Sequence, residues 1–234
     1  SGDGTAGVAT VTLTSGTASV SRSVTFTGAA ASFAVTSLTS TYGVATYGSE
    51  KTYASTDADG IKVAGLDAAG NAAASGDFYA VSSNTAVATV PTAVQTINKA
   101  GNLISVTGVS VGTATITIQN AATAADSTVS KTIEVEVSTG TAATVAMALD
   151  KADYQPGEPG VLSITLTNAA GRPVADGTYT IFATGLASNL FMQNNGSGSN
   201  DTFTAGATSV TTQGGVAAYD IYAPAFSGTL NITA

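Results

Sequence analysis

The chain lacks the residue types on which most catalytic and metal-binding sites depend. Its 234 residues include no cysteine, no histidine and no tryptophan. Without histidine the commonest acid–base group and metal ligand is missing, and without cysteine there is no thiolate nucleophile. A Ser-His-Asp or Cys-His arrangement is therefore excluded. Paired carboxylates could still hydrolyse glycosides, but the acidic residues are scattered beside turn signals, so we expect no enzymatic activity.

Charge is also scarce. Charged residues are 9% of the chain, against about 25% in an average protein, and 7 basic against 15 acidic residues give a net charge of −8. No basic cluster exists, so nucleic acid is not an expected partner. An acidic surface disfavours anionic membranes, and no apolar run reaches about 18 residues, so we expect no membrane insertion by this segment.

Small and β-branched residues are abundant where charged and aromatic residues are scarce. Hydrophobic residues are 44% of the chain but mostly alanine and valine, and aromatic residues are only 6%. Valine and threonine favour a pleated, half-buried surface, and small side chains suit the thin core between two packed sheets. With so few charges, threonine, serine and asparagine must provide most of the polar surface.

The hydrophobic pattern has the period of a β-strand. Apolar residues alternate with polar ones over 132–138 and over 162–167, which places one face on a core and the other in water. No window shows a helical period of 3.6. Many short strands with regular turn signals predict an all-β chain built of sandwich domains.

Internal repeats are the most informative feature of the sequence. Three segments read alike, each a glycine followed by an alternating strand, and they begin 105 and 103 residues apart: Gly7–Leu13 (GVATVTL), Gly112–Ile118 (GTATITI) and Gly215–Ile221 (GVAAYDI). After the first two of these segments comes a second shared strand, at 21–26 and 130–135. This strand is followed by Thr-Gly at 27–28 and 139–140.

A further match without gaps relates the middles of two domains at an offset of 101 residues. It aligns Asp-Ala-Ala-Gly at 67–70 with Asn-Ala-Ala-Gly at 168–171, and leaves about eleven extra residues near 39–49. We therefore predict the end of a preceding domain, a complete domain and a nearly complete one, with both chain ends interior to a longer array. The predicted limits are 1–27, 28–139 and 140–234.

Two stretches resemble bacterial immunoglobulin-like domains. Residues 82–90 (SSNTAVATV) followed by 108–118 (GVSVGTATITI) resemble the group 2 pattern, over most of 28–139. Residues 150–157 (DKADYQPG) followed by 162–174 (LSITLTNAAGRPV) resemble the group 1 or invasin-like variety, over 140–234. The resemblance implies tandem immunoglobulin-like sandwiches and supplies no site residues.

The family's members imply two kinds of role. The first is a structural segment of a self-assembling extracellular surface protein, a surface layer (S-layer) or filament, whose partners are copies of itself at the cell surface. The alternative is an adhesin stalk or a phage-decoration module that presents loops to a ligand. A ligand-binding module should gather aromatic or charged residues at loop tips, where this sequence offers only Tyr42 and Tyr47. This scarcity favours the structural role.

No cofactor is expected, and the single metal candidate is calcium at Asp57 and Asp59. Alternating carboxylates before Gly60 can wrap Ca²⁺ with side-chain and backbone oxygens. Two carboxylates fall short of the six to eight oxygens that Ca²⁺ takes, so an Asx turn before a strand at Ile61 is the interpretation we favour.

Two other groups of residues have simple alternatives. Asp150, Asp153 and Glu158 form a second acidic cluster, for which solvated loop charges are the favoured interpretation. Three sites match the acceptor pattern for N-glycosylation, and chance accounts for them equally well because serine, threonine and asparagine are abundant. They are Asn195, Asn200 and Asn231.

Overall fold

The structure, a computed structural model, consists of β-strands and connecting turns. It describes residues 6–183, 187–188, 193–194, 201–202, 207–223, 227–229 and 232–233. The chain divides into two compact units: unit 1 is Ser1–Thr39 with Val44–Glu136, and unit 2 is Ser40–Gly43 with Val137–Ala234. Every regular element in the described ranges is a strand, which confirms the predicted fold class of tandem immunoglobulin-like sandwiches. The domain limits drawn from the repeats stay predictions.

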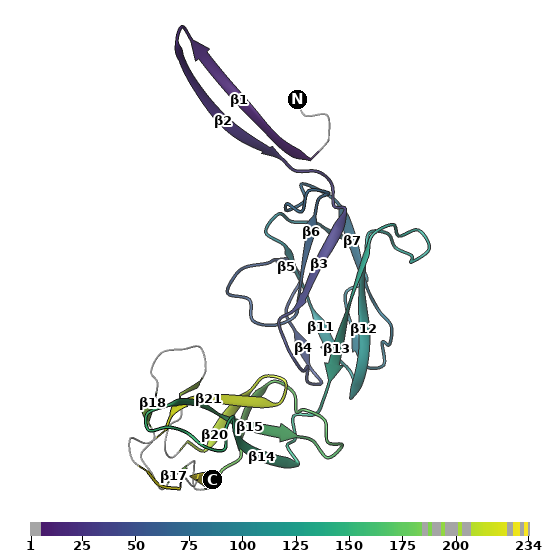
Figure 1. The fold of residues 1–234 in the computed structure, drawn as a ribbon. Helices are drawn as coiled ribbons and strands as arrows, with labels where there is room; N and C mark the ends of the chain where they lie inside the picture. Colours follow the sequence, from purple (N-terminus) through teal and green to yellow (C-terminus); the bar gives the residue numbers. More distant parts are fainter. Residues whose placement is uncertain are drawn as a thin grey trace. The chain divides into compact units, whose positions relative to one another are not determined.

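Unit 1 contains two four-stranded sheets and one three-stranded sheet, which can be followed in Figure 1. The first sheet has the order β3 (Ser32–Ser37), β6 (Ile61–Leu66), β10 (Asn102–Ile104), β5 (Lys51–Thr52). The second has the order β13 (Ser130–Val137), β12 (Gly112–Gln119), β7 (Asp77–Ser82), β9 (Gln95–Thr96). The third has the order β4 (Thr46–Tyr47), β11 (Val106–Gly108), β8 (Ala88–Thr89).

The two larger sheets of unit 1 pack on each other through their apolar faces. Ile61 of β6 and Ile116 of β12 are fully buried, and each alternates with more exposed neighbours along its strand. Phe33 of β3 meets Phe78 of β7 across the core, with ring centroids 6.1 Å apart at 62°. This edge-to-face contact joins the two sheets. Fully burying a side chain of this size stabilises a fold by about 1.5–3 kcal/mol, so the alternation drives the sandwich.

A long hairpin comes before β3 in the chain. β1 (Gly7–Ser15) and β2 (Ala18–Phe26) pair antiparallel over nine residues each, from Gly7↔Phe26 to Ser15↔Ala18. The connecting loop is Gly16-Thr17, and Gly16 has a φ of 61°. A positive φ at the first loop residue suits the right-handed twist of a two-residue hairpin and requires glycine. Within the described residues, β1 and β2 pair only with each other.

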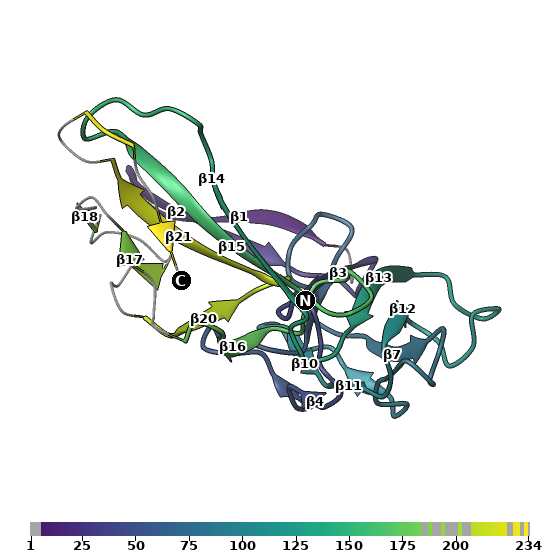
Figure 2. The same cartoon turned by 90° about the horizontal axis from the view of Figure 1, so that it is seen from below.

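Unit 2 is built around β15 (Pro159–Thr167), which lies between β14 (Thr144–Leu149) and β21 (Val216–Tyr222). Figures 1 and 2 both show this order. β18 (Gln193–Asn194) pairs antiparallel with β21, and β19 (Asp201–Thr202) pairs parallel with it. Two further pairs are β16 (Gly177–Thr180) with β20 (Ser209–Thr212), and β17 (Ala187–Ser188) with β22 (Ile232–Thr233).

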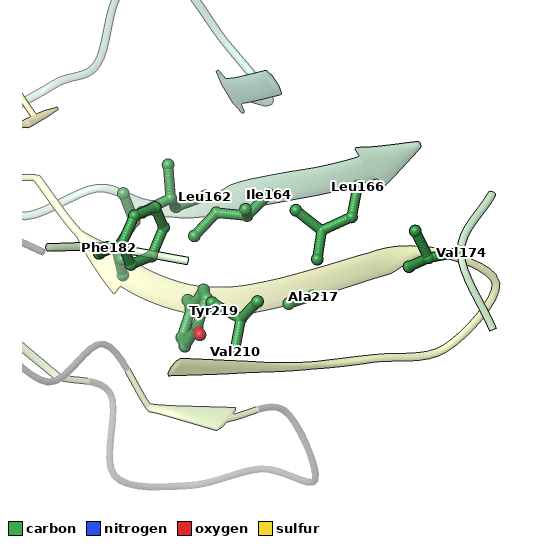
Figure 3. Packing of buried hydrophobic residues seen from close by; sticks show 9 residues of the cluster. Leu162, Ile164, Leu166, Val174, Phe182, Val210, Ala217 and Tyr219 are labelled. Atoms are coloured by element: carbon green, nitrogen blue, oxygen red, sulfur yellow. The ribbon is translucent and has the colours of Figure 1, made fainter. Parts of the chain in front are cut away.

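The core of unit 2 lies on one face of β15. Leu162, Ile164 and Leu166 are fully buried, and Figure 3 shows them in a row on the side of β15 that faces Tyr219 and Val210. Because Val210 lies on β20, the core joins the sheet of β15 to the smaller sheet of β16 and β20. The alternation read over 162–167 therefore predicted this core correctly.

One predicted strand equivalence is wrong. β21 holds the third copy of the glycine-plus-strand pattern, which the repeat aligns with β12. In the structure β21 pairs with β15, with Tyr219 opposite Leu162, in the way that β10 pairs with β6, with Ile104 opposite Ile61. β12 instead pairs with β7. The pattern specifies a turn and a two-faced strand, and nothing in it specifies which strand lies alongside.

The insertion near 39–49 contributes a segment to unit 2. Tyr42 of this segment is fully buried, forms a bridge with Val137, and accepts the Ser138 N–H through its carbonyl at 2.8 Å. Asp176 holds the segment from the other side. Its carboxylate accepts the N–H groups of Ser40 (2.7 Å), Thr41 (3.2 Å) and Gly214 (2.7 Å).

The Asp/Asn-Ala-Ala-Gly repeat forms the same turn in both units. In unit 1 the Oδ1 of Asp67 accepts the N–H groups of Ala69 and Asn71, both at 2.9 Å. In unit 2 the Oδ1 of Asn168 accepts the N–H groups of Ala170 (2.9 Å) and Arg172 (3.1 Å). The closing glycines, Gly70 and Gly171, have φ of 81° and 73°, where a side chain would be strained.

Each turn also forms a hydrogen bond to a residue that comes before β3 in unit 1 or before β14 in unit 2. The Oδ2 of Asp67 accepts the Gly28 N–H at 3.1 Å, and the Nδ2 of Asn168 donates to the Ser138 hydroxyl at 3.0 Å. Asp67 is 3% exposed. Burial opposes ionisation of its carboxyl, but the N–H groups of Gly28, Asn71 and Ala69 outweigh it, so its pKa is lowered. The turn residue therefore links the segment before β3 or β14 to the end of the strand that pairs with it, β6 or β15.

We predict that Asp67→Ala destabilises unit 1 by about 1–3 kcal/mol, because the buried Gly28 N–H loses its acceptor. Asp67→Asn keeps an Oδ1 for the two turn bonds, as Asn168 does, and should lose less. Urea unfolding measures the loss, and hydrogen exchange of β6 assigns it to unit 1. Equal stability of the alanine variant and the unsubstituted chain would contradict this role for the turn.

Candidate assembly surface

β14 is an edge strand without the usual protection. Its sequence, TVAMAL, contains neither charge nor proline, and β15 is its only strand neighbour in the described sheet. An edge strand presents a row of unpaired N–H and C=O groups, which natural proteins usually guard with charges, proline or a cover. β13, an edge of unit 1, does carry such charges, at Lys131, Glu134 and Glu136.

The side chains of β14 are exposed as well as its backbone edge. Val145 lies opposite Leu166 and Met147 opposite Ile164, so both point to the face of the sheet that forms the core. Yet Val145 is 47% exposed and Met147 is 37% exposed, while their partners on β15 are fully buried. The core-facing side of β14 is therefore only partly covered by the described residues of unit 2, in contrast to that of β15. A shallow hollow beside it is lined by Met147, Ala148, Leu149, Asp150, Lys151, Ala152 and Leu162.

The equivalent strand of unit 1, β3, is also an uncharged edge, with sequence SFAVTS. Its inward Phe33 is only 6% exposed, because Phe78 covers it. The β14 edge, defined as the free side of Thr144–Leu149 with exposed Val145 and Met147, is thus the more open of the two. Sequence reasoning did not identify these residues. A domain-opening strand without charge is the signal that could have found them.

Hydroxyl groups pair across the solvent faces of the sheets. Thr178 and Thr211 lie 3.0 Å apart through their hydroxyls, and Thr180 and Ser209 lie 2.8 Å apart. Thr144 hydrogen-bonds Thr167 in the same way across β14 and β15. Such cross-strand pairs stabilise a sheet by about 0.2–1 kcal/mol each. The sheet faces are therefore polar with little charge, as the composition predicted.

Asp57, the first calcium candidate, has partners for both carboxylate oxygens, and Asp59 is exposed. Asp57 is 8% exposed at its side chain, and its Oδ1 lies 2.6 Å from the Lys51 Nζ. Its Oδ2 accepts the Ala54 N–H at 2.8 Å, so it closes the turn that precedes it. The hydrogen bond from Lys51 is the main cause that lowers the pKa of Asp57. Among the described residues, no group of three or more acidic side chains is placed to hold a metal ion.

The second acidic cluster forms contacts within one loop. Asp150 accepts the Tyr154 hydroxyl at 2.5 Å and the Val161 N–H at 2.7 Å. Glu158 pairs with the Lys151 Nζ at 2.5 Å and accepts the Gln155 N–H at 2.7 Å. Bonds from Tyr154 and Lys151, respectively, lower the pKa of Asp150 and of Glu158, and the bond to Glu158 raises the pKa of Lys151.

The remaining candidates are placed as follows. Tyr42 is buried in unit 2 and is no loop-tip aromatic, and Tyr47 is half-buried on β4. The three glycosylation candidates Asn195, Asn200 and Asn231 lie outside the described residues. No helix in the described part of the chain is long and apolar enough to cross a membrane.

No family model matches the sequence, and the search of curated proteins also found no match. Among solved structures the chain is similar to surface layer protein SbsC, domains 4–9 (19% identity, TM-score 0.38, 97% of this chain and 33% of that one). It is also similar to S-layer protein rSbsC(31–844), with 19% identity and a TM-score of 0.37 over 90% of this chain and 26% of that one. A third similar structure is FdeC, an Escherichia coli adhesin, with 16% identity and a TM-score of 0.40 over 98% of this chain and 69% of that one. The chain thus spans about a third or less of these S-layer structures. With TM-scores below 0.5, the functional argument rests on the chain's own residues.

We predict that neither millimolar Ca²⁺ nor a chelator changes the melting temperature, because both oxygens of Asp57 already have partners. Thermal unfolding in each condition is the measurement, with Asp57→Asn as the control for general ionic effects. A large upward shift in Ca²⁺ that the variant abolishes would contradict the prediction, since a ligand of the native state stabilises by mass action.

We also predict that unit 2 loses stability in acid through Glu158 and Asp150. Their pKa values are lower in the folded state, so their contribution is present above the ordinary carboxyl pKa, about 4, and is lost as pH falls through the folded pKa. Urea midpoints at neutral and acid pH should differ less in Glu158→Gln than in the unsubstituted chain. Asp153→Asn, at an exposed position of the same loop, is the control, and an equal reduction there would refute the assignment.

Proposed function

We propose that the chain is a structural, non-catalytic segment of an extracellular surface protein that assembles with copies of itself into a layer or filament. The observation that carries the proposal is the β14 edge, an uncharged strand with exposed apolar side chains. A strand of this kind is a template for pairing with another chain. The composition supports the non-catalytic part, because histidine and cysteine are missing from the sequence.

The number of free edges fits an extended assembly. One self-complementary contact, β14 against β14, would close a two-fold dimer and stop there. The chain has a second uncharged edge of the same kind, β3 in unit 1. Two contacts on each copy are the minimum for an open filament.

Charge has little part in such contacts. β3 and β14 contain no charged residue, and Thr144 of β14 forms a hydroxyl pair with Thr167 of β15. At physiological ionic strength salt largely screens exposed charges that are more than about 8 Å apart, but it does not weaken main-chain hydrogen bonds or apolar burial in that way. The assembly should therefore persist at high salt.

We predict that the chain sediments as an assembly at both low and high NaCl, and that Met147→Lys dissociates it. An inward-pointing charge is one of the devices by which edge strands avoid pairing. Thr165→Lys is the matched control, because it adds the same charge to the solvent face of β15, a strand with neighbours on both sides. Sedimentation velocity and the melting temperature of each variant are measured together.

The possible outcomes separate the functions. A chain that is monomeric at both salt concentrations would refute assembly and favour the passive stalk of an adhesin. Dissociation by salt alone would show that charged residues such as Lys131, Glu134 and Glu136 hold the contact. Equal dissociation by Met147→Lys and Thr165→Lys would exclude the β14 edge as the interface.

A further inference from the structure

The hairpin of β1 and β2 has one apolar face and one face that is polar apart from Val8. Its register places Thr10 with Ser23, Thr12 with Ser21 and Thr14 with Ser19 on the polar face. The other face, called the apolar hairpin face below, consists of Ala9, Val11, Leu13, Val20, Val24 and Phe26, with Arg22 among them. All of these residues are exposed, and the large apolar ones are Val11 (52%), Leu13 (70%), Val20 (55%), Val24 (40%) and Phe26 (41%).

A face of this kind is not stable in water by itself. An isolated two-stranded hairpin is marginal, and it gains stability when further strands or a packing partner cover its hydrophobic side. An exposed contiguous apolar patch marks an interaction site. The apolar hairpin face therefore requires an occupant.

The repeat identifies what kind of occupant fits. β1 and β2 correspond in sequence to β12 and β13, which form the last two strands of unit 1. Ala114, Ile116 and Ile118 stand at the positions of Ala9, Val11 and Leu13, and they are 2%, 0% and 0% exposed. Val135, at the position of Phe26, is 2% exposed, and Lys131, at the position of Arg22, is exposed.

The strands that pack on β12 therefore show what kind of strands would pack on β1. β12 has β7 along one side, with Ser82 opposite Ile116 and Ala80 opposite Ile118. Its apolar residues pack toward the opposite sheet, which contains the buried Ile61 and Ile104. The free side of β1 thus fits a strand like β7, and the apolar hairpin face fits a sheet like that of β3, β6 and β10.

Chain order identifies the source of that cover. At the second junction the order is β12, β13, the linker 138–143 and then β14, and the hairpin completes the domain that precedes the linker. At the first junction the order is β1, β2, the linker 27–31 and then β3. The same Asp/Asn turn fastens both linkers, through Gly28 and Ser138.

We propose that the apolar hairpin face is covered by the remaining strands of an immunoglobulin-like domain encoded before residue 1 in the same polypeptide. The hairpin then supplies the last two strands of that domain, with β1 inside the sheet and β2 at its edge. The proposal is independent of assembly through the β14 edge, because it concerns a contact within one polypeptide.

The fit of the hairpin to a sandwich can be tested inside unit 1. A graft replaces 112–118 by 7–13 and 130–135 by 21–26, which keeps the loop between them. At the buried positions it exchanges one apolar residue for another, as in Ile116→Val, Ile118→Leu and the larger Val135→Phe. We expect it to fold cooperatively, with β12 protected from hydrogen exchange. Ile116→Thr with Ile118→Thr, which brings polar-face residues to the same positions, should lose that protection. A graft that behaves like this control would overturn the proposal.

The source of the cover is tested by hydrogen exchange of residues 7–26. We expect rapid exchange in the monomeric 234-residue chain and protection in the monomeric longer polypeptide as its source encodes it. Leu13→Asp should abolish the protection there, and Thr12→Asp, on the polar face, should not. Exchange that stays rapid in the longer polypeptide overturns the proposal. Protection that grows with the concentration of the 234-residue chain assigns the face to a second copy and also overturns it. Met147→Lys, which tests assembly through the β14 edge, should leave all these results unchanged. A failure of the assembly proposal can therefore be told apart from a failure of this one.

Discussion

A sheet with one apolar face must have that face covered, and the architecture of this chain follows from that requirement. Residues that alternate with period two create such a face on nearly every strand. In unit 1 the faces of β6 and β12 cover each other, and Phe33 meets Phe78 between them. In unit 2 the row of Leu162, Ile164 and Leu166 lies beside the buried residues of β21 in the same sheet, and Val210 of β20 packs against it from the smaller sheet. Where cover is missing, at β1 with β2 and at β14, the structure presents its candidate contact surfaces.

The shortage of charge determines what kind of contact these surfaces can make. Most proteins protect an edge strand with charged residues, as β13 does here. The chain has few charged residues, and several of them already form ion pairs or hydrogen bonds with nearby residues. Asp57 pairs with Lys51, Glu158 pairs with Lys151, and Asp67 and Asp176 accept backbone N–H groups. Hydroxyl pairs then provide the polar surface, and contacts between copies rely on main-chain pairing and apolar burial.

Sequence reasoning succeeded where the signal was local. The alternation over 132–138 and 162–167 corresponds to β13 and β15, and the Asp/Asn-Ala-Ala-Gly repeat corresponds to a turn with the same hydrogen bonds in both units. It failed for Gly215–Ile221, because a glycine followed by an alternating strand describes both β12 and β21, which pair with different strands. It also misjudged Tyr42, whose burial depends on a segment distant in sequence, at Val137 and Ser138.

The sequence by itself determined the β class, the strand-by-strand alternation, the turn chemistry and the exclusion of histidine- and cysteine-based catalysis, because each depends on residue type or on spacing within a few positions. The tertiary structure alone decided which strands became neighbours, which edge stayed open and which apolar face lacked cover. Those properties depend on contacts between residues far apart in the chain, such as Leu162 with Tyr219 or Asp176 with Ser40, and no local pattern encodes the partner. The lack of charge in β14 is visible in the sequence, but the open edge and the exposure of Val145 and Met147 appear only in the folded chain.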